Sequence, residues 1–192
     1  MPTLTINKAK TAVLCMDYQN DVLKGYPSAQ GLAGKAAGVL SAARAARLPV
    51  IYIVVGFRDG FPEISPRNKT FSLMPSSGMF RPGSEGGHVT KEVAPQPGDI
   101  VVTKHRVGAF HQTDLDMILR AKGIETLVLF GVATAGVVLS TVRYAVDADY
   151  EVVVIDDLCA DRDDEVHRVL MQKVFKRQCT VATAEEFVQA LK

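Results

Sequence analysis

Short runs rich in apolar and β-branched residues recur along the chain, and each ends at a polar residue or a glycine. Runs of this kind, with little alternation between apolar and polar positions, are typical of strands buried on both faces of a parallel sheet. The pattern predicts six strands, at residues 11–16, 50–56, 99–103, 126–130, 151–155 and 179–181.

The segments between most of these runs have helical patterns. An Ala-rich stretch at 29–47 predicts a helix that is closed by Pro49. Thr113 and Asp116 have the spacing of a capping box, which would begin a helix that stops at Gly123. Further helices are predicted at 134–148, 162–176 and 184–191.

Alternating strands and helices predict the fold class. We expect an α/β, three-layer, Rossmann-like fold: a central, mostly parallel six-stranded sheet with helices on both faces, forming one domain over residues 1–192. Residues 57–99 depart from this pattern, because they hold six of the nine prolines and show little periodicity. A segment this long without regular structure is usually functional or makes contacts, and we do not interpret it as a linker.

Composition and charge narrow the class of protein. The chain has 192 residues, 47% hydrophobic and 22% charged, and a net charge of +1, so it lacks the field that nucleic acid or an anionic membrane would need. Three cysteines are too few for a disulfide framework and favour a reducing compartment. We find no signal peptide and no apolar stretch near the roughly 20 residues of a membrane span, and we expect a soluble, cytoplasmic protein.

Polar residues follow several of the predicted strands, where a parallel sheet forms its ligand crevice. Asp17 ends the first strand, Lys104 the third and Asp156 the fifth, while the turn after the fourth begins at Gly131. We expect Asp17 and Lys104 to meet across adjacent strands as a coupled pair able to move a proton. Each residue alone is more often a turn cap or a solvated lysine, so the hypothesis depends on their convergence.

Three segments resemble the isochorismatase-like hydrolases of the cysteine hydrolase superfamily, a group that includes nicotinamidases and N-carbamoylsarcosine amidases. They are AVLCMDYQND, VVTKHRVGAF and LVLFGVATAGVVLSTVRYA, and the similarity extends from about residue 10 to the C-terminus. The resemblance implies that Asp17 is the acid/base with Lys104 beside it. It also implies a cis peptide between Val132 and Ala133 that helps to present an oxyanion hole, and a homo-oligomer, either a dimer or a tetramer.

The chain departs from that family at one position. The nucleophilic cysteine would stand six residues beyond the turn glycine, which is Val137 here, and a valine cannot form an acyl-enzyme. Isochorismatases proper also lack this cysteine. They protonate a vinyl ether that water then cleaves, and pyruvate is released. A resemblance to these enzymes would suggest a glycine at the position where this chain has Val137. Our hypothesis is a hydrolase of a small organic substrate that uses Asp17 and Lys104. The alternative is a non-catalytic pseudoenzyme that binds a small ligand or serves in assembly.

Other hydroxyl and thiol groups offer few replacements for the missing nucleophile. Cys15 is expected in the core and Cys179 at the opposite edge of the sheet, which leaves Cys159 as the one plausible thiol. Thr134 and Ser140 have no evident adjacent base, and Thr134 is expected to cap a helix.

Substrate contacts and cofactors complete the set of expectations. Arg58, with Arg67 and Arg81 as further candidates, is predicted to hold a substrate carboxylate. Phe110 is predicted to form an apolar wall together with Phe57 and Phe80. We expect no metal, because residues 56–68 lack the Asp-x-His motif of nicotinamidases and the four histidines have no ligand spacing, and we expect no other cofactor.

Overall fold

A parallel sheet organises the chain in the computed structural model, which describes residues 4–81 and 83–192. Its strand order is β3-β2-β1-β4-β5-β6, and every neighbouring pair runs parallel. The strands are β1 (Thr11–Met16), β2 (Val50–Val55), β3 (Ile100–Lys104), β4 (Thr126–Gly131), β5 (Glu151–Ile155) and β6 (Thr180–Ala182). The six predicted strands are therefore confirmed to within a residue, and the sheet is fully rather than mostly parallel.

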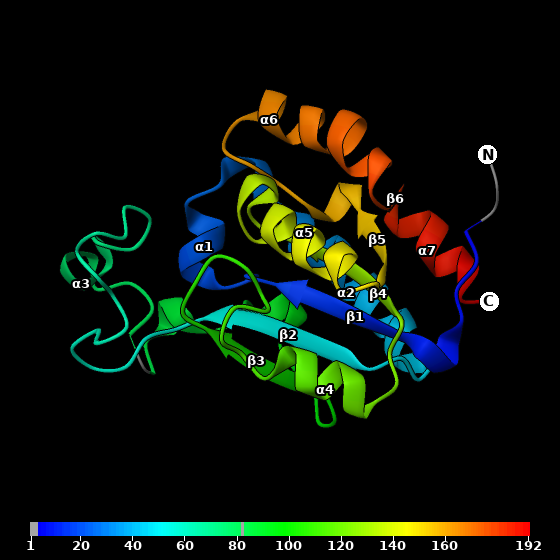
Figure 1. Cartoon of the computed structure of the whole chain (residues 1–192), viewed down its shortest axis with the longest axis horizontal. Coiled ribbons are helices and arrows are strands. Elements are labelled where there is room, and N and C mark those ends of the chain that lie inside the picture. The colour runs from blue at the N-terminus through cyan, green and yellow to red at the C-terminus, as the bar shows by residue number, and fades with distance from the viewer. Residues whose placement is uncertain (1–3, 82) are drawn as a thin grey trace.

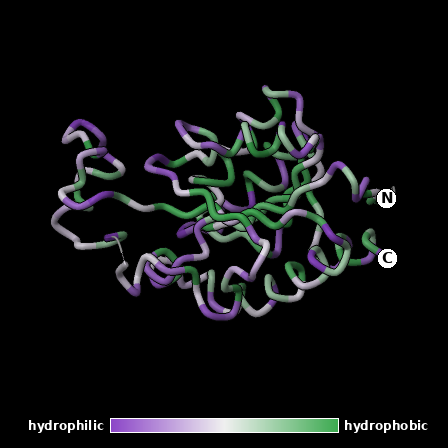
Figure 2. The backbone as a smooth tube through the Cα atoms, turned by 90° about the horizontal axis from the view of Figure 1, so that it is seen from below, coloured by the Kyte–Doolittle hydropathy of each residue, from purple (hydrophilic) through white to green (hydrophobic). Residues whose placement is uncertain are grey.

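The central strands lie inside the molecule because their residues are apolar on both faces. All six residues of β1 and all six of β4 are buried, and Figure 2 shows the most hydrophobic stretches of chain gathered in the middle of the molecule. Edge strand β3 differs, since Val101 is half exposed. Burial on both faces explains why these runs lack the alternation of a half-exposed strand.

Helices cover the sheet and make three layers (Figure 1). In that view α4 (Leu115–Ala121) and α5 (Leu139–Asp147) lie in front of the sheet, and α2 (Leu32–Ala45) lies behind it. The remaining α-helices are α1 (Asn20–Lys24), α3 (Met74–Ser77), α6 (Asp164–Val169) and α7 (Ala184–Ala190). Short 3₁₀ or π turns are η1 (Lys8–Lys10), η2 (Pro27–Ala29), η3 (Glu85–Gly87), η4 (Lys91–Val93), η5 (Thr134–Val138), η6 (Asp156–Leu158), η7 (Leu170–Val174) and η8 (Phe175–Arg177). Among the described residues, no helix is both long and apolar enough to cross a membrane.

Several helix boundaries differ from the predicted ones. The predicted helix at 134–148 is divided, because Gly136 has non-helical angles (φ −98°, ψ −106°) within η5. The predicted capping box at Thr113 is wrong: Asp114 is the N-cap of α4 and makes no side-chain cap bond. A complete capping box stands instead at Thr183 and Glu186, at the start of α7.

Residues 57–81 form an arm that projects from the carboxyl end of the sheet, with α3 at its far side (Figure 1). The arm has a small apolar cluster of its own, which contains Phe57, Phe61, Phe71 and Phe80 together with Val55 of β2. This cluster is separate from the main core, and Val22 of α1 and Val107 pack against it from the body.

Buried Gln19 joins the end of β2 to the segment that follows the arm. Its amide nitrogen donates to the carbonyl oxygens of Val55 and Gly87 at 2.8 and 2.7 Å, and its amide oxygen accepts from the Val55 N–H at 2.7 Å. The next two residues along the chain bond the same segment, since Asn20 donates to the Glu85 carbonyl and Asp21 accepts from the Phe80 N–H. The segment that returns from the arm is therefore held against α1.

Candidate active site

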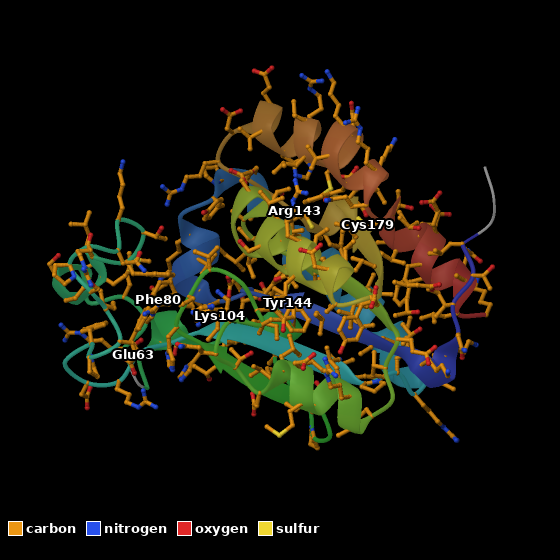
Figure 3. All side chains as sticks on the ribbon, in the orientation of Figure 1. Glu63, Phe80, Lys104, Arg143, Tyr144 and Cys179 are labelled. Atoms are coloured by element: carbon orange, nitrogen blue, oxygen red, sulfur yellow. The ribbon has the colours of Figure 1, made fainter. Side chains whose placement is uncertain are left out.

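A cavity of about 830 Å³ opens at the carboxyl edge of the sheet. Asp17 after β1, Lys104 at the end of β3 and the turn after β4 all line it. The arm adds an apolar part of the wall through Phe71, Met74, Met79 and Phe80. Figure 3 shows Lys104 and Phe80 at this same end of the molecule. The 57–99 segment thus contributes to the cavity wall.

Asp17 stands where β1 ends, and the backbone bends there. Its φ of 57° is left-handed, a conformation that Asp tolerates better than most residues, and its N–H donates to the Ile53 carbonyl at 2.8 Å. The residue is 6% exposed, and its Oδ1 has no hydrogen-bond partner among the described residues. Burial raises the pKa of this carboxyl, although the neighbouring Lys104 ammonium acts in the opposite direction.

Lys104 is the charge partner of Asp17. Its Nζ lies 2.9 Å from Asp17 Oδ2 and donates to the Arg106 carbonyl at 3.2 Å, and the side chain is 2% exposed. The predicted convergence is therefore observed, but not across adjacent strands, because β2 lies between β1 and β3. The long lysine side chain spans the end of β2 to reach the carboxylate.

The turn after β4 is tightly packed where it passes Asp17's strand. A Cβ at Gly131 would lie 2.8 Å from the Met16 carbonyl oxygen, so a larger residue does not fit there. The peptide bond between Val132 and Ala133 is cis, as the family resemblance implied. Both residues line the cavity together with Val137, which is 2% exposed. Val137 thus presents an apolar side chain to the cavity.

None of the chain's three thiols lines the cavity. Cys15 is buried in β1, and Cys159 is buried with its Sγ donating to the Ile155 carbonyl, so burial raises the pKa of both thiols. Burial also raises the pKa of Cys179 to about 12, and Figure 3 shows this residue near β6, away from Lys104. Protonated, enclosed thiols are poor nucleophiles.

Two predicted substrate contacts lie outside the cavity. The Arg58 side chain is 72% exposed and pairs with Glu63 at 2.5 Å, because the chain turns outward into the arm after β2. Phe110 stacks on Tyr144, with ring centroids 4.4 Å apart, beside a different surface hollow. The structure does not bring either residue to Asp17. Of the additional candidates, Phe80 lines the cavity and Phe57 is buried in the arm's cluster.

Arg162 is a cavity residue that the sequence pattern did not indicate. The predicted helix began at Arg162, but α6 begins at Asp164, with Asp163 as an N-cap that accepts from two backbone N–H groups. Arg162 is therefore in the loop after β5, where its guanidinium lies 5.0 Å from the centre of the Tyr26 ring. Tyr26 and Lys24 line the cavity as well. The position of Arg162 after the fifth strand, on the same sheet edge as Asp17, was the sequence signal that could have identified it as a cavity residue.

Thr134 has a basic neighbour that sequence reasoning also missed. Its Oγ1 lies 2.8 Å from His167 Nδ1, and His167 Nε2 lies 3.0 Å from Asp156 Oδ1. The expectations that Thr134 caps a helix and has no adjacent base are therefore wrong, because α6 packs against the turn and brings His167 to it. No group of three or more potential metal ligands gathers within the part of the chain that the structure describes.

Comparisons with known proteins agree on the family. The isochorismatase domain model matches residues 11–186. An uncharacterised isochorismatase family protein of Bacillus subtilis is 32% identical over the full length of both chains. A ureidoacrylate amidohydrolase of Agrobacterium fabrum is 31% identical, over 96% of this chain and 91% of its own.

Solved structures of related proteins have the same fold as this chain. A cysteine hydrolase from Pseudomonas syringae superposes with a TM-score of 0.91 at 25% identity, covering 98% of this chain and 95% of its own. An N-carbamoylsarcosine amidase from Thermoplasma acidophilum superposes with a TM-score of 0.76 at 30% identity, covering 92% of this chain and 97% of its own.

Proposed function

We propose that this chain, which belongs to the isochorismatase family of hydrolases, hydrolyses a small organic substrate by acid–base chemistry without a cysteine nucleophile. The carrying observation is the buried pair of Asp17 and Lys104 beside a cavity that Val137 also lines. In this proposal Val137 occupies the position at which the family resemblance implies a nucleophilic cysteine. Asp17 is the proton donor and acceptor in this proposal. Lys104 holds its other oxygen and stabilises the carboxylate once the proton has left.

The first candidate reaction is hydrolysis of a vinyl ether. Protonated Asp17 gives its proton to the terminal alkene carbon, and the carbon bound to the ether oxygen becomes a stabilised cation. Water bonds to that carbon and returns a proton to Asp17. The resulting hemiketal breaks its C–O bond and transfers its hydroxyl proton to the leaving oxygen, so a ketone and an alcohol are released. Each proton that Asp17 donates is thus replaced from water.

The cavity wall suggests the class of substrate. Lys24 and Arg162 line it and carry positive charge, while Phe71, Met74, Met79 and Phe80 line it with apolar surface. A guanidinium binds a carboxylate through paired hydrogen bonds, so these residues favour a small carboxylate with an apolar portion. The cavity's volume of about 830 Å³ is ample for such a molecule.

A second candidate reaction is hydrolysis of a C–N bond by water that Asp17 deprotonates. The relatives named as ureidoacrylate amidohydrolase and N-carbamoylsarcosine amidase favour it. In this case Asp17 takes a proton from the attacking water and delivers it to the departing nitrogen. The two reactions differ in the protonation state that Asp17 needs at the start. The non-catalytic alternative, a module for ligand binding or assembly, has less support, because the acid–base pair converges in the cavity.

A substrate panel run on matched variants tests the proposal. The panel contains vinyl ethers of hydroxy acids, N-carbamoyl amino acids and simple amides, and the variants are wild type, Asp17→Asn and Asp21→Asn. We expect Asp17→Asn to lose at least about 100-fold in kcat/KM on the active class, because removing a general acid or base costs roughly that factor. Asp21→Asn controls for the loss of a cavity carboxylate. Equal activity in wild type and Asp17→Asn, or no turnover of any compound, contradicts the proposal.

The remaining expectations accompany this function as proposals. We infer a single domain over residues 1–192, a metal-free and cofactor-free site, and a cytoplasmic homo-oligomer, either a dimer or a tetramer. Neither a nucleic acid nor a membrane is a partner in this proposal. The half-exposed edge strand β3 and the exposed Leu73 of the arm are compatible with self-association.

A further inference from the structure

Three side chains from three segments form a hydrogen-bonded series next to the turn that follows β4. Asp156, the first residue after β5, contacts His167 Nε2 at 3.0 Å, and His167 Nδ1 contacts Thr134 Oγ1 at 2.8 Å. This series of side chains therefore extends from the end of β5 through α6 to the first residue of η5.

Hydrogen-bond chemistry gives this chain a direction. An ionised Asp156 only accepts, so the proton belongs on His167 Nε2. A neutral imidazole then has a bare Nδ1, which accepts a hydrogen bond from the Thr134 hydroxyl. In this arrangement each of the three side chains has a matched donor or acceptor.

Thr134 is not itself a nucleophile, although the arrangement resembles a catalytic triad. The residue is completely buried and does not line the cavity. Its neighbours do, since Val132 and Ala133 on one side and Ala135, Gly136 and Val137 on the other all line it. Thr134 is thus the middle residue of the backbone segment that lines the cavity, and its side chain is bonded to His167.

The turn needs support from outside, because its own helical bonding is irregular. Gly136 interrupts it with non-helical angles, and the Ala135 N–H is held by Asp161 Oδ2 at 2.7 Å. The Thr134 N–H likewise donates to the Ala160 carbonyl at 2.8 Å. The segment after β5 therefore holds the turn by its backbone, and the His167 contact adds the one side-chain bond of Thr134.

We propose that Thr134 and His167, oriented by Asp156, are positioning residues that hold the cavity wall formed by residues 132–137 in the geometry that the reaction requires. This inference rests on the proposed function, because it concerns the same cavity. A wall displaced by a fraction of an ångström misplaces the substrate relative to Asp17, and such misplacement lowers the rate of the chemical step.

Paired substitutions separate the bond from the bulk of the side chain. Thr134→Val keeps the size and branching but removes the hydroxyl, whereas Thr134→Ser keeps the hydroxyl. His167→Asn keeps a polar atom near the Nδ1 position, and His167→Gln keeps one near the Nε2 position. Thr134→Val and His167→Gln, which remove the contact at Thr134, therefore each have a matched control at the same site.

We expect kcat to fall roughly 10- to 100-fold in Thr134→Val and His167→Gln, since both lose the contact at Thr134. KM should stay within about twofold, because ground-state binding is unchanged. Thr134→Ser and His167→Asn should recover most of the rate. A wild-type kcat in Thr134→Val, or no recovery in Thr134→Ser, overturns the inference while leaving the proposed function intact.

Nitrogen NMR of ¹⁵N-labelled histidine gives a readout that does not need a substrate. The His167 resonances should report a proton on Nε2 and a hydrogen-bonded, bare Nδ1, and Thr134→Val should shift the Nδ1 resonance and the backbone amides of residues 133–137. If the panel yields no substrate, the proposed function fails and these spectra alone decide the inference. Unchanged amide resonances in Thr134→Val overturn it, and shifted ones support it.

Discussion

Asp17 is under two opposing influences, and their balance decides what the residue can do. Burial favours the neutral carboxylic acid, while the Lys104 ammonium at 2.9 Å favours the carboxylate. Burial prevails, so the pKa of Asp17 is raised above its ordinary value of 3.8. A carboxyl group tuned in this way carries a proton at a higher pH than an exposed aspartate, which suits a residue that must donate one.

The pH dependence of kcat/KM distinguishes the two candidate reactions. If Asp17 begins as the acid, activity is highest at low pH and falls as pH rises through the raised pKa of Asp17. If it begins as the base, activity rises with pH through the same pKa. We expect the falling limb on a vinyl ether substrate, with a midpoint above 3.8. Initial rates between pH 4 and 9 measure it, and a rising limb contradicts the vinyl ether mechanism.

The elements differ in how far local pattern decides them. Strands β1 and β5 match their predicted bounds, because a buried parallel strand needs only a short apolar run. Helices are less local. The helix after β4 is broken at Gly136, and the stretch after β5 becomes α6, η7 and η8 instead of one continuous helix. Packing against the turn and the sheet outweighs propensity in both places.

Helix α2 allows a test at the scale of an element. Gly38 is exposed in its interior, and a Cβ there would meet nothing within 4 Å. Gly38→Ala should therefore raise the free energy of unfolding by about 0.5–1 kcal/mol, because alanine loses less backbone entropy on folding. Urea unfolding measures the change. Gly31→Ala is the control, because its φ of 79° disfavours a side chain, and it should destabilise.

The molecule has a body, which contains the main core, and an arm with a separate apolar cluster. The main core extends through the sheet and its helices, whereas the arm has its own small cluster. Asp21 accepts from the Phe80 N–H of the arm, and Arg106 donates to the Glu63 carbonyl. Arg44 secures the far end of the returning segment, since its guanidinium binds Asp99 through two bonds and also donates to the Tyr52 hydroxyl. Local opening is easiest where buried contacts are few, which points to the arm.

Limited proteolysis tests this division. The arm offers exposed tryptic sites at Arg67 and Lys69, whereas the exposed Lys35 lies within α2. We expect the first cut to fall in the arm, because cleavage requires local unfolding and a helix in the body opens less readily. Mass spectrometry of early fragments identifies the site. An initial cut at Lys35 contradicts the prediction, and a substrate that contacts Phe71 and Phe80 should slow cleavage in the arm.

Local chemistry along the chain was enough to place the sheet, its functional edge and the pair of Asp17 and Lys104 on that edge. Apolar runs and the polar residues that end them are properties of neighbours in sequence, and parallel strands bring their ends together in any such fold. That Val137 replaces the family's nucleophile stays a prediction from the resemblance. The roles of these residues stay predictions until a substrate is found.

Only the tertiary structure decided which distant side chains share the cavity. In the fold, β2 lies between the strands of Asp17 and Lys104. Arg58 points outward and pairs with Glu63, whereas Arg162 lies beside Tyr26 at the cavity. The fold also sets His167 against Thr134. These contacts join segments far apart in the chain, and their geometry depends on helix ends and packing that no local pattern specifies. The physical reason is that hydrophobic periodicity along the sequence indicates which residues are buried, whereas the hydrogen-bond partner of a buried polar group depends on how the whole chain folds.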